Sequence, residues 1–306
     1  MTKKVTDLPA SVHARLKALA RERGRPFQEI FYFYAIERFL YRLSQSRYSH
    51  DFVLKGALMF WGWGLLLRRP TRDIDVQGNM ANDTNALVEV VRKICILPVE
   101  PDGMEFDPES ILGEQINLVA NQPGVRVRFE GHLGSARIWL QLDVSFANPI
   151  VPSEVRVSYP TMLDQSSFQL MGYPYETAIA EKVESMVDLG QINSRLKDFY
   201  DIWLLVRKVD IKGQVLVDAI AATFQARGTP IPANQPVALT DGFAHEKQQL
   251  WQSFIQRNQL EAFAPPTLVQ VIQDLRSFLL PPLQAAGREK EFDTTWVFSK
   301  GWKKTV

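Results

Sequence analysis

The sequence predicts an α+β protein in which a small mixed sheet is preceded and followed by helices along the chain. Segments that alternate between apolar and polar residues are concentrated between residues 51 and 160. Outside that range, apolar residues recur at helical spacing, and the pattern after Pro160 is almost wholly helical. We therefore expect a helical lead-in over 1–50, a core over 51–160 and a helical C-terminal domain over 161–306.

Apolar residues at helical spacing predict two helices in the lead-in. Val12, Leu16 and Leu19 fit one face of a helix over residues 10–23. The second helix is expected over residues 26–46, because Pro is well suited to the first turn of a helix.

The core is expected to mix short strands with helices, and its segment 99–110, rich in Pro and acidic residues, is expected to be a loop. The expected core elements are strands at 52–54 and 73–77, helices at 56–63 and 83–95, and a hairpin of 125–130 and 137–145. The expected C-terminal helices are 175–189, 194–208, 214–227, 243–257 and 266–280.

Composition narrows the class of protein. Residues 1–72 carry 14 Lys+Arg against 5 Asp+Glu, whereas residues 73–120 carry 2 against 10, which suits a polyanion held beside metal-binding carboxylates. Two solvated faces that happen to differ in charge would give the same counts. The single cysteine, Cys95, excludes a disulfide framework and a Cys-rich zinc site within one chain. With no apolar signal core and no apolar run long enough to span a membrane, we expect a soluble, cytoplasmic protein.

The triplet Asp73-Ile74-Asp75 is the most informative motif for chemistry. Side chains alternate along a strand, so both carboxylates leave one face while Ile74 packs behind them. Two carboxylates about 7 Å apart repel each other unless a cation joins them, and Mg²⁺ prefers such hard oxygen ligands. The alternative is an exposed strand end whose carboxylates are solvated or pair with Arg72.

Asp143 offers a third carboxylate on a neighbouring strand. Ile138, Leu140 and Leu142 lie on one face of that strand, so Asp143 points the other way. Three carboxylates could form a two-metal site for phosphoryl or nucleotidyl transfer. On its own, Asp143 could equally lie on the solvated face of a half-buried strand.

The segment Phe52-Val53-Leu54-Lys55-Gly56-Ala57-Leu58 precedes the carboxylates. A strand that turns at Gly into a helix can direct backbone N–H groups at a phosphate, although an ordinary strand–turn–helix has the same pattern.

Two later helices carry further polar residues. Lys182 flanks the apolar face of the 175–189 helix, where its ammonium could reach a phosphate or simply extend into solvent. Arg195, Asp198 and Asp201 share a face of the next helix, as a structural ion-pair stripe also would.

The order of these motifs resembles the AbiEii/AbiGii family of nucleotidyltransferase-like toxins, which are distant relatives of polymerase β. The motifs that carry the resemblance are Phe-Val-Leu-Lys-Gly-Ala-Leu, Arg69-Pro70-Thr71-Arg72-Asp73-Ile74-Asp75, Glu181-Lys182 and Arg195-Leu196-Lys197-Asp198-Phe199-Tyr200-Asp201. The resemblance covers most of the chain and implies the nucleotidyltransferase fold. It also implies a toxin of a toxin–antitoxin or abortive-infection system that acts in phage defence, together with a cognate antitoxin.

The resemblance further implies Mg²⁺-dependent, or Mn²⁺-dependent, transfer of a nucleoside monophosphate from an NTP to RNA, with tRNA as the favoured acceptor. The implied metal ligands are Asp73 and Asp75, with Asp143 as a third. Lys182 would neutralise the triphosphate, and Asp198 would position Lys182 or activate the acceptor.

Nucleotide binding is expected at Lys55, Gly56 and Ala57, although Gly-Ala-Leu replaces the family's Gly-Gly-Ser/Thr and lacks its hydroxyl. Two alternatives stay open: transfer to a protein or small molecule, and a catalytically silent binding protein with this fold. The basic lead-in favours RNA, since neutralising several phosphates requires several Lys or Arg. The RNA-binding candidates are Arg68, Arg69 and Arg72; the alternative is that these arginines pair with the acidic segment 73–120 and only hold the fold.

Overall fold

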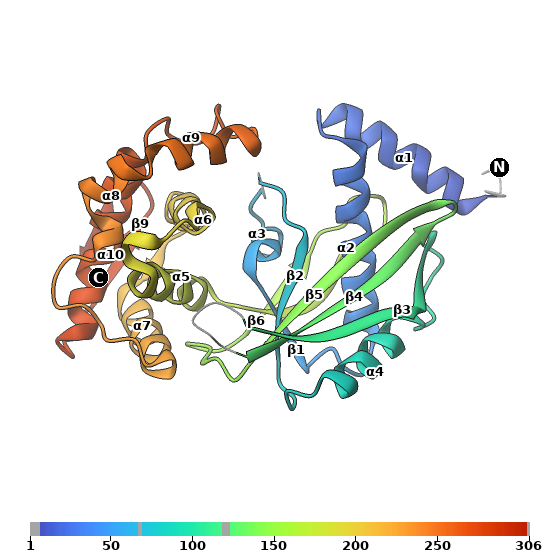
Figure 1. Cartoon of the computed structure of the whole chain (residues 1–306), viewed down its shortest axis with the longest axis horizontal. Coiled ribbons are helices and arrows are strands. Elements are labelled where there is room, and N and C mark those ends of the chain that lie inside the picture. The colour runs from blue at the N-terminus through green and yellow to red at the C-terminus, as the bar shows by residue number, and fades with distance from the viewer. Residues whose placement is uncertain (1–6, 67–68, 118–122, 305–306) are drawn as a thin grey trace. The chain divides into compact units, whose positions relative to one another are not determined.

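The computed structural model describes residues 7–66, 69–117 and 123–304, which form two compact units (Figure 1). Unit 1 comprises Met1–Leu66, Pro70–Ala147 and Arg156–Gly172, and unit 2 comprises Leu67–Arg69, Asn148–Val155 and Tyr173–Val306. The sequence predicted three parts instead. The helical lead-in is not separate, because its second helix is built into the core of unit 1.

Unit 1 is an α+β unit whose described residues include a seven-stranded mixed sheet in the order β3-β4-β5-β2-β1-β7-β6. Its strands are β1 (Phe52–Lys55), β2 (Asp73–Gly78), β3 (Met104–Asn117), β4 (Pro123–Leu133), β5 (Ala136–Phe146), β6 (Val155–Tyr159) and β7 (Phe168–Gly172). Its helices are α1 (Leu8–Glu22), α2 (Phe27–Gln45), the 3-10 turn η1 (Gly56–Leu58), α3 (Met59–Gly62) and α4 (Thr84–Cys95). Central β2 pairs parallel with β5 and antiparallel with β1.

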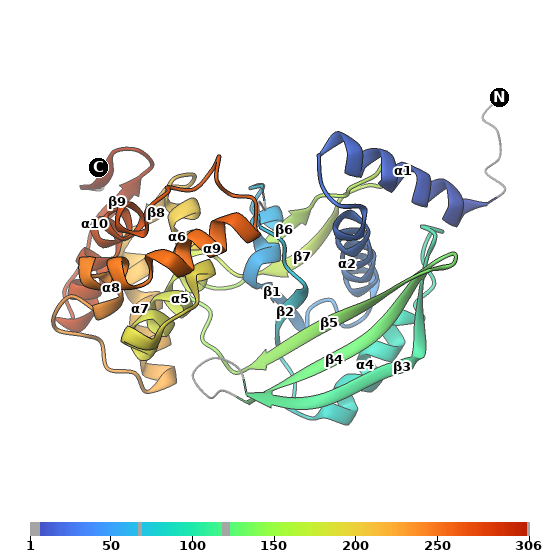
Figure 2. The same cartoon turned by 45° about the horizontal axis from the view of Figure 1, so that its top comes forward.

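One face of this sheet is apolar and covered by helices. Ile74 and Val76 of β2 are buried on that face, and α2 and α4 pack against it (Figures 1 and 2). Phe39 of α2 lies 4.7 Å from the ring of Phe129 on β4 and 5.9 Å from that of Phe106 on β3. Apolar burial on one side thus directs the alternate, polar side chains of each strand to the other side.

Unit 2 is mainly helical. Its helices are α5 (Tyr175–Leu189), α6 (Leu196–Val206), α7 (Gly213–Arg227), α8 (Asp241–Glu246), α9 (Gln248–Arg257) and α10 (Leu268–Gly287). A small sheet is formed by β8 (Ile211–Lys212), β9 (Thr294–Val297) and β10 (Gly301–Lys304). The ring of Trp302 stacks on Phe278 of α10 at 5.4 Å, and Trp296 meets Phe278 edge-on at 4.9 Å. In the described part of the chain, no helix is both long and apolar enough to cross a bilayer.

Several elements differ from the sequence-based expectations. Most of the loop expected at 99–110 belongs to the edge strand β3, whose register shifts between Asp107 and Leu112 around Pro108. An edge strand tolerates Pro and exposed charges, and this hides the alternating pattern. Strand β7 interrupts the region expected to be helical after Pro160. The helix expected at 243–257 divides at Lys247 into α8 and α9.

The buried carboxylate of Glu37 makes the stability of unit 1 dependent on pH. Glu37 of α2 is buried, its Oε2 accepts a hydrogen bond from the Met162 amide at 2.6 Å, and its Oε1 lies 2.6 Å from Nη2 of Arg38. Burial raises the pKa of the Glu37 carboxyl to about 7, even though Arg38 and the amide favour the charged form. The folded state therefore holds this proton more tightly than the unfolded chain does.

This pKa gives a stability prediction. A carboxyl whose folded pKa lies above its unfolded value of about 4.5 contributes stability at low pH and loses it as pH rises to about 7. Relative to the Glu37→Gln variant, the wild type should lose up to about 3 kcal/mol of unfolding free energy across that window. Denaturant unfolding of both proteins from pH 4.5 to pH 8 measures the difference. A difference that does not change with pH would mean that Glu37 titrates normally.

Candidate active site

The face of the sheet opposite α2 and α4 is polar at its centre. Asp73 and Asp75 of β2 stand in register with Gln141 and Asp143 of β5, respectively. Because residues paired across adjacent strands point to the same face, all four side chains share it. Ile74, between the two β2 carboxylates, is buried on the other face. The pleat of β2 thus places Asp73 and Asp75 on one side, with Asp143 beside Asp75.

A hydrogen-bond network connects these groups. Arg126 of β4 donates from Nε and Nη2 to the two oxygens of Asp143, each at 2.8 Å. The amide of Gln141 donates to Oδ1 of Asp73 at 2.7 Å and to Oδ2 of Asp143 at 3.3 Å. The hydrogen bonds that Arg126 donates to Asp143 raise the pKa of the Arg126 guanidinium. Asp143 is therefore buried with its charge compensated.

The carboxylates differ in how well they suit a divalent metal ion. Asp73 and Asp75 supply the hard oxygen donors that Mg²⁺ prefers, and both side chains are partly accessible. Asp143 accepts two hydrogen bonds from Arg126 and would have to exchange that guanidinium for a metal ion. Among the described residues, no three His, Cys, Asp or Glu side chains are grouped so as to hold a metal ion. The donor set thus fits a cation at Asp73 and Asp75 best.

The turn after β1 contacts one of these carboxylates. Gly56 has φ +69°, and a Cβ added to it would lie 2.3 Å from Oδ2 of Asp75. Lys55 is the register partner of Asp75 across β1 and β2. Ala57 and Leu58 are buried, so their side chains help form the core. Glycine is therefore required at this turn both for its backbone conformation and for the space that Asp75 occupies.

Tyr32 of α2 also lies beside the carboxylates. Its hydroxyl donates a hydrogen bond to the backbone oxygen of Arg72, the residue before Asp73. Burial, together with the negative charge of Asp73, raises the pKa of the Tyr32 phenol, which therefore stays protonated at neutral pH. A neutral phenol in this place can donate a hydrogen bond but cannot add a third negative charge.

Unit 2 contains a second charged cluster, built on α5 and α6. Nζ of Lys182 lies 2.6 Å from Oδ1 of Asp198 and 3.0 Å from Oδ2 of Asp201. Arg69 donates from Nε and Nη2 to the two oxygens of Asp201, at 2.8 and 2.7 Å. Arg195 donates from Nε to the second oxygen of Asp198 at 2.8 Å. Three cations thus share two carboxylates.

The cluster stays ionised at neutral pH. Burial alone would lower the pKa of Lys182, but the two carboxylates outweigh burial and raise it. Burial alone would raise the pKa of Asp198 and of Asp201, but Lys182 and the two arginines hold both pKa values below their ordinary range. The five side chains therefore carry a net charge of +1, and the Lys182 side chain is still 19% exposed. This excess positive charge can attract a phosphate.

The three arginines proposed for RNA binding differ in what the structure shows of them. Arg72 is exposed. Arg69 is buried in a two-bond pair with Asp201, which lies outside the acidic segment 73–120 that was the expected alternative partner. Arg68 lies outside the described residues. Arg72 is therefore the one of the three that the described structure presents to solvent.

The sequence did not predict that Tyr32, Gln141 and Arg126 lie beside the carboxylates of unit 1. Tyr32 is 41 positions from Asp73, and no local pattern connects them. A signal for Arg126 did exist, because extending the expected hairpin with its Gly134 turn places Arg126 opposite Asp143.

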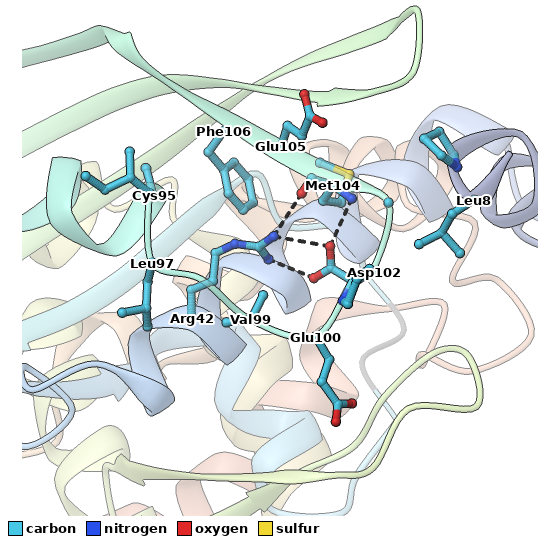
Figure 3. A pocket seen from close by; sticks show the side chains of 14 residues that line it. Leu8, Arg42, Cys95, Leu97, Val99, Glu100, Asp102, Met104, Glu105 and Phe106 are labelled. Atoms are coloured by element: carbon cyan, nitrogen blue, oxygen red, sulfur yellow. Dashed lines mark hydrogen bonds and ion pairs between the residues drawn. The ribbon is translucent and has the colours of Figure 1, made fainter. Parts of the chain in front are cut away.

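A cavity of about 400 Å³ in unit 1 contains none of the proposed site residues (Figure 3). Arg42 and Asp102 lie at its wall, where Nη1 of Arg42 donates to Oδ2 of Asp102 at 2.7 Å. The guanidinium also donates to the backbone oxygens of Arg38 and Met104. Because protein groups already accept these bonds, this arginine is engaged structurally and is a poor anion receptor.

The contact between Gly56 and Asp75 gives a matched prediction. Gly56→Ala should destabilise the protein and displace the Asp75 carboxylate, because the new Cβ overlaps Oδ2. Gly64→Ala is the control, since Gly64 has a similar φ of +72° but open space where its Cβ would be. Gly64→Ala should cost only the backbone strain of about 1–2 kcal/mol. Equal losses of unfolding free energy in the two variants would show that the Asp75 contact is unimportant.

Comparison with known proteins identifies the family. The family model "Nucleotidyl transferase AbiEii toxin, Type IV TA system" matches residues 38–278. The chain is similar in structure to MenT4, nucleotidyltransferase toxin Rv2826c from Mycobacterium tuberculosis H37Rv, at 15% identity and a TM-score of 0.51 with 91% of each chain covered. It is also similar to JHP933 from Helicobacter pylori, at 12% identity and a TM-score of 0.46, covering 86% of this chain and 93% of that one. A search of curated proteins found no match. The chain has the nucleotidyltransferase fold and belongs to the AbiEii family of nucleotidyltransferase toxins of type IV toxin–antitoxin systems.

Proposed function

We propose that this nucleotidyltransferase toxin transfers a nucleoside monophosphate from an NTP to an RNA acceptor, with tRNA favoured. Membership of the family implies a nucleotide substrate and an antitoxin partner. The observation that carries the proposal is the sharing of one sheet face by Asp73, Asp75 and Asp143, with the Gly56 turn against Asp75. In such a transfer, an acceptor hydroxyl bonds to the α-phosphorus as the bond to pyrophosphate breaks.

Asp73 and Asp75 would hold Mg²⁺ or Mn²⁺, and Asp143 would be a third ligand if Arg126 releases it. When bound, the metal ion supplies charge neutralisation for the phosphates and activation of the attacking oxygen. Gln141 would keep the Asp73 carboxylate oriented through its hydrogen bond. The release of Asp143 from Arg126 would also free a guanidinium that could contact a phosphate.

The β1 turn would bind the nucleotide through Lys55 and the backbone of Gly56 and Ala57. Lys55 lies in register with Asp75, so its side chain would leave the same face of the sheet as the proposed metal ligands. The turn has no side-chain hydroxyl, so nucleotide contacts there would come from backbone N–H groups and from Lys55.

Lys182 would neutralise part of the triphosphate charge. Asp198 is better suited to positioning Lys182 than to accepting a proton from the acceptor, because its lowered pKa makes it a weak base. Asp201 shares the positioning role through its 3.0 Å contact with Lys182, and Arg69 fixes Asp201 in turn.

The RNA acceptor is supported by charge rather than by a motif. Residues 1–72 carry 14 Lys+Arg against 5 Asp+Glu, and exposed Arg72 directly precedes Asp73. A polyanion gains more from such a segment than a small acceptor does.

A catalytically silent binding protein is the second candidate function. Ala57 and Leu58 are buried where many relatives are expected to present a hydroxyl, and Asp143 is already paired with Arg126. Both features would suit a fold that has lost its chemistry.

Incubation with each labelled NTP, Mg²⁺ and total tRNA tests transfer. Wild-type protein should label RNA, and Asp73→Asn or Asp75→Asn should lower the rate roughly 100-fold or more, since each removes a charge that would hold the metal ion. Asp188→Asn removes an exposed carboxylate of α5 and serves as the control. Label found only in protein would replace RNA as the acceptor. No transfer with any NTP would favour the silent binding protein.

Lys182 gives a further prediction. Lys182→Ala should abolish transfer and relieve toxicity while the protein stays folded, because Asp198 keeps Arg195 and Asp201 keeps Arg69. The loss in unfolding free energy should stay below the ~3–5 kcal/mol that follows when a buried charge loses every partner. Lys182→Arg should restore little activity, because a planar guanidinium does not replace a compact ammonium. Full activity in a stably folded Lys182→Ala protein would show that Lys182 is a structural residue.

A further inference from the structure

An exposed tryptophan lies on the same sheet face as the carboxylates. Trp139 of β5 is 50% exposed, whereas its chain neighbours Ile138 and Leu140 are buried on the opposite face. Gln141 and Asp143 follow Trp139 at alternate positions and therefore point to its side of the sheet. An aromatic ring that is half exposed on this polar face contributes less to the core than a buried one does and is accessible to a ligand.

Two arginines flank the indole. Arg137 precedes Trp139 by two positions on β5, and its side chain is 72% exposed. Arg128 lies on β4 opposite Gln141, one step along the sheet from Trp139, and its side chain is 47% exposed. Glu130 stands directly opposite Trp139, but it is largely buried and lies near His132 and Arg137. Arg128 also lies 3.4 Å from Glu114 and 3.3 Å from the Gln141 amide oxygen.

The distance from the indole to the carboxylates suits a bound strand. Alternate residues on a strand are about 7 Å apart, so Trp139 lies about 13 Å along β5 from Asp143. Gln141 lies halfway, and its amide bonds to Asp73. Asp73 is in register with Gln141, so it lies only about 7 Å along the sheet from Trp139, and a strand with one base on the indole can reach it.

We propose that Trp139, Arg128 and Arg137 bind the single-stranded end of the RNA acceptor, with a base stacked on the indole and phosphates on the arginines. The proposal rests on the proposed function and names how its acceptor is held. Every base has a π-face, so an aromatic platform with flanking cations binds single strands with little sequence preference. Bases in a duplex are already stacked and are not available to the indole.

A polynucleotide fits this surface better than the NTP does. The arginines lie on both sides of Trp139 along the sheet, and a strand has phosphates on both sides of each base. A mononucleotide has phosphates at one end only, so it could use only one of the two arginines.

Binding of a labelled single-stranded RNA of about ten nucleotides tests the proposal, with its duplex as comparison. Trp139→Ala should weaken binding of the single strand roughly ten-fold or more, and Trp139→Phe should keep most of it. Phe298→Ala removes an aromatic ring of unit 2 that is 47% exposed and should change nothing. Thermal unfolding of each variant establishes that it folds.

The salt dependence of RNA binding tests the role of Arg128 and Arg137. Replacing Arg128 and Arg137 together with Gln should flatten the log–log salt dependence by roughly 0.7 for each phosphate that is no longer neutralised. Binding of NTP with Mg²⁺, measured separately, should be unchanged in the Trp139 variants.

Three results would overturn the platform. The first is a folded Trp139→Ala protein that binds the single strand as well as the wild type does. The second is a Trp139→Ala protein that loses NTP binding but keeps RNA binding, because the indole would then bind the nucleotide. Equal or tighter binding of the duplex by the wild type is the third. If wild-type protein labels RNA while Trp139→Ala binds and reacts normally, only the platform fails. If wild-type protein labels only protein and binds no RNA, the RNA acceptor of the proposed function fails with it.

Discussion

The two-residue repeat of strand β2 is the constraint on which the proposed site in unit 1 depends. Ile74 and Val76 are buried on the face of the sheet against which α2 and α4 pack, and this fixes the register of β2 and directs Asp73 and Asp75 to the other face. A slip by one residue would bury both carboxylates and expose the isoleucine. The apolar core thus sets the geometry of the charged groups, although it makes no contact with a substrate.

In both units, buried carboxylates are paired with cations. Buried Asp143 is balanced by Arg126 in unit 1, whereas in unit 2 Lys182, Arg69 and Arg195 share Asp198 and Asp201. Isolated buried charges would be costly, so each carboxylate is held by at least one cation. The cluster of unit 2 contains one more cation than carboxylates, so its five side chains have a net positive charge.

Much of the fold, and the elements on which the candidate site residues lie, could be predicted because they follow from patterns within short stretches of sequence. The strand at Asp73, the turn at Gly56 and the helix of Lys182 each follow from apolar spacing within a few residues. Strand β3 could not be predicted, because an edge strand with Pro108 and exposed charges has no alternating signal. The pairing of Arg69 with Asp201 spans 132 positions, so only the folded chain reveals that Arg69 is buried and paired.

Asp73 and Asp75 are proposed to hold the divalent cation that accompanies the nucleotide. Electron paramagnetic resonance of Mn²⁺, titrated with protein in the presence of a non-reactive NTP analogue, measures this binding directly. Wild-type protein should remove the free Mn²⁺ signal, and the Asp73→Asn and Asp75→Asn proteins should bind the ion far more weakly while remaining folded. Equal Mn²⁺ binding by the wild type and by both variants would contradict it.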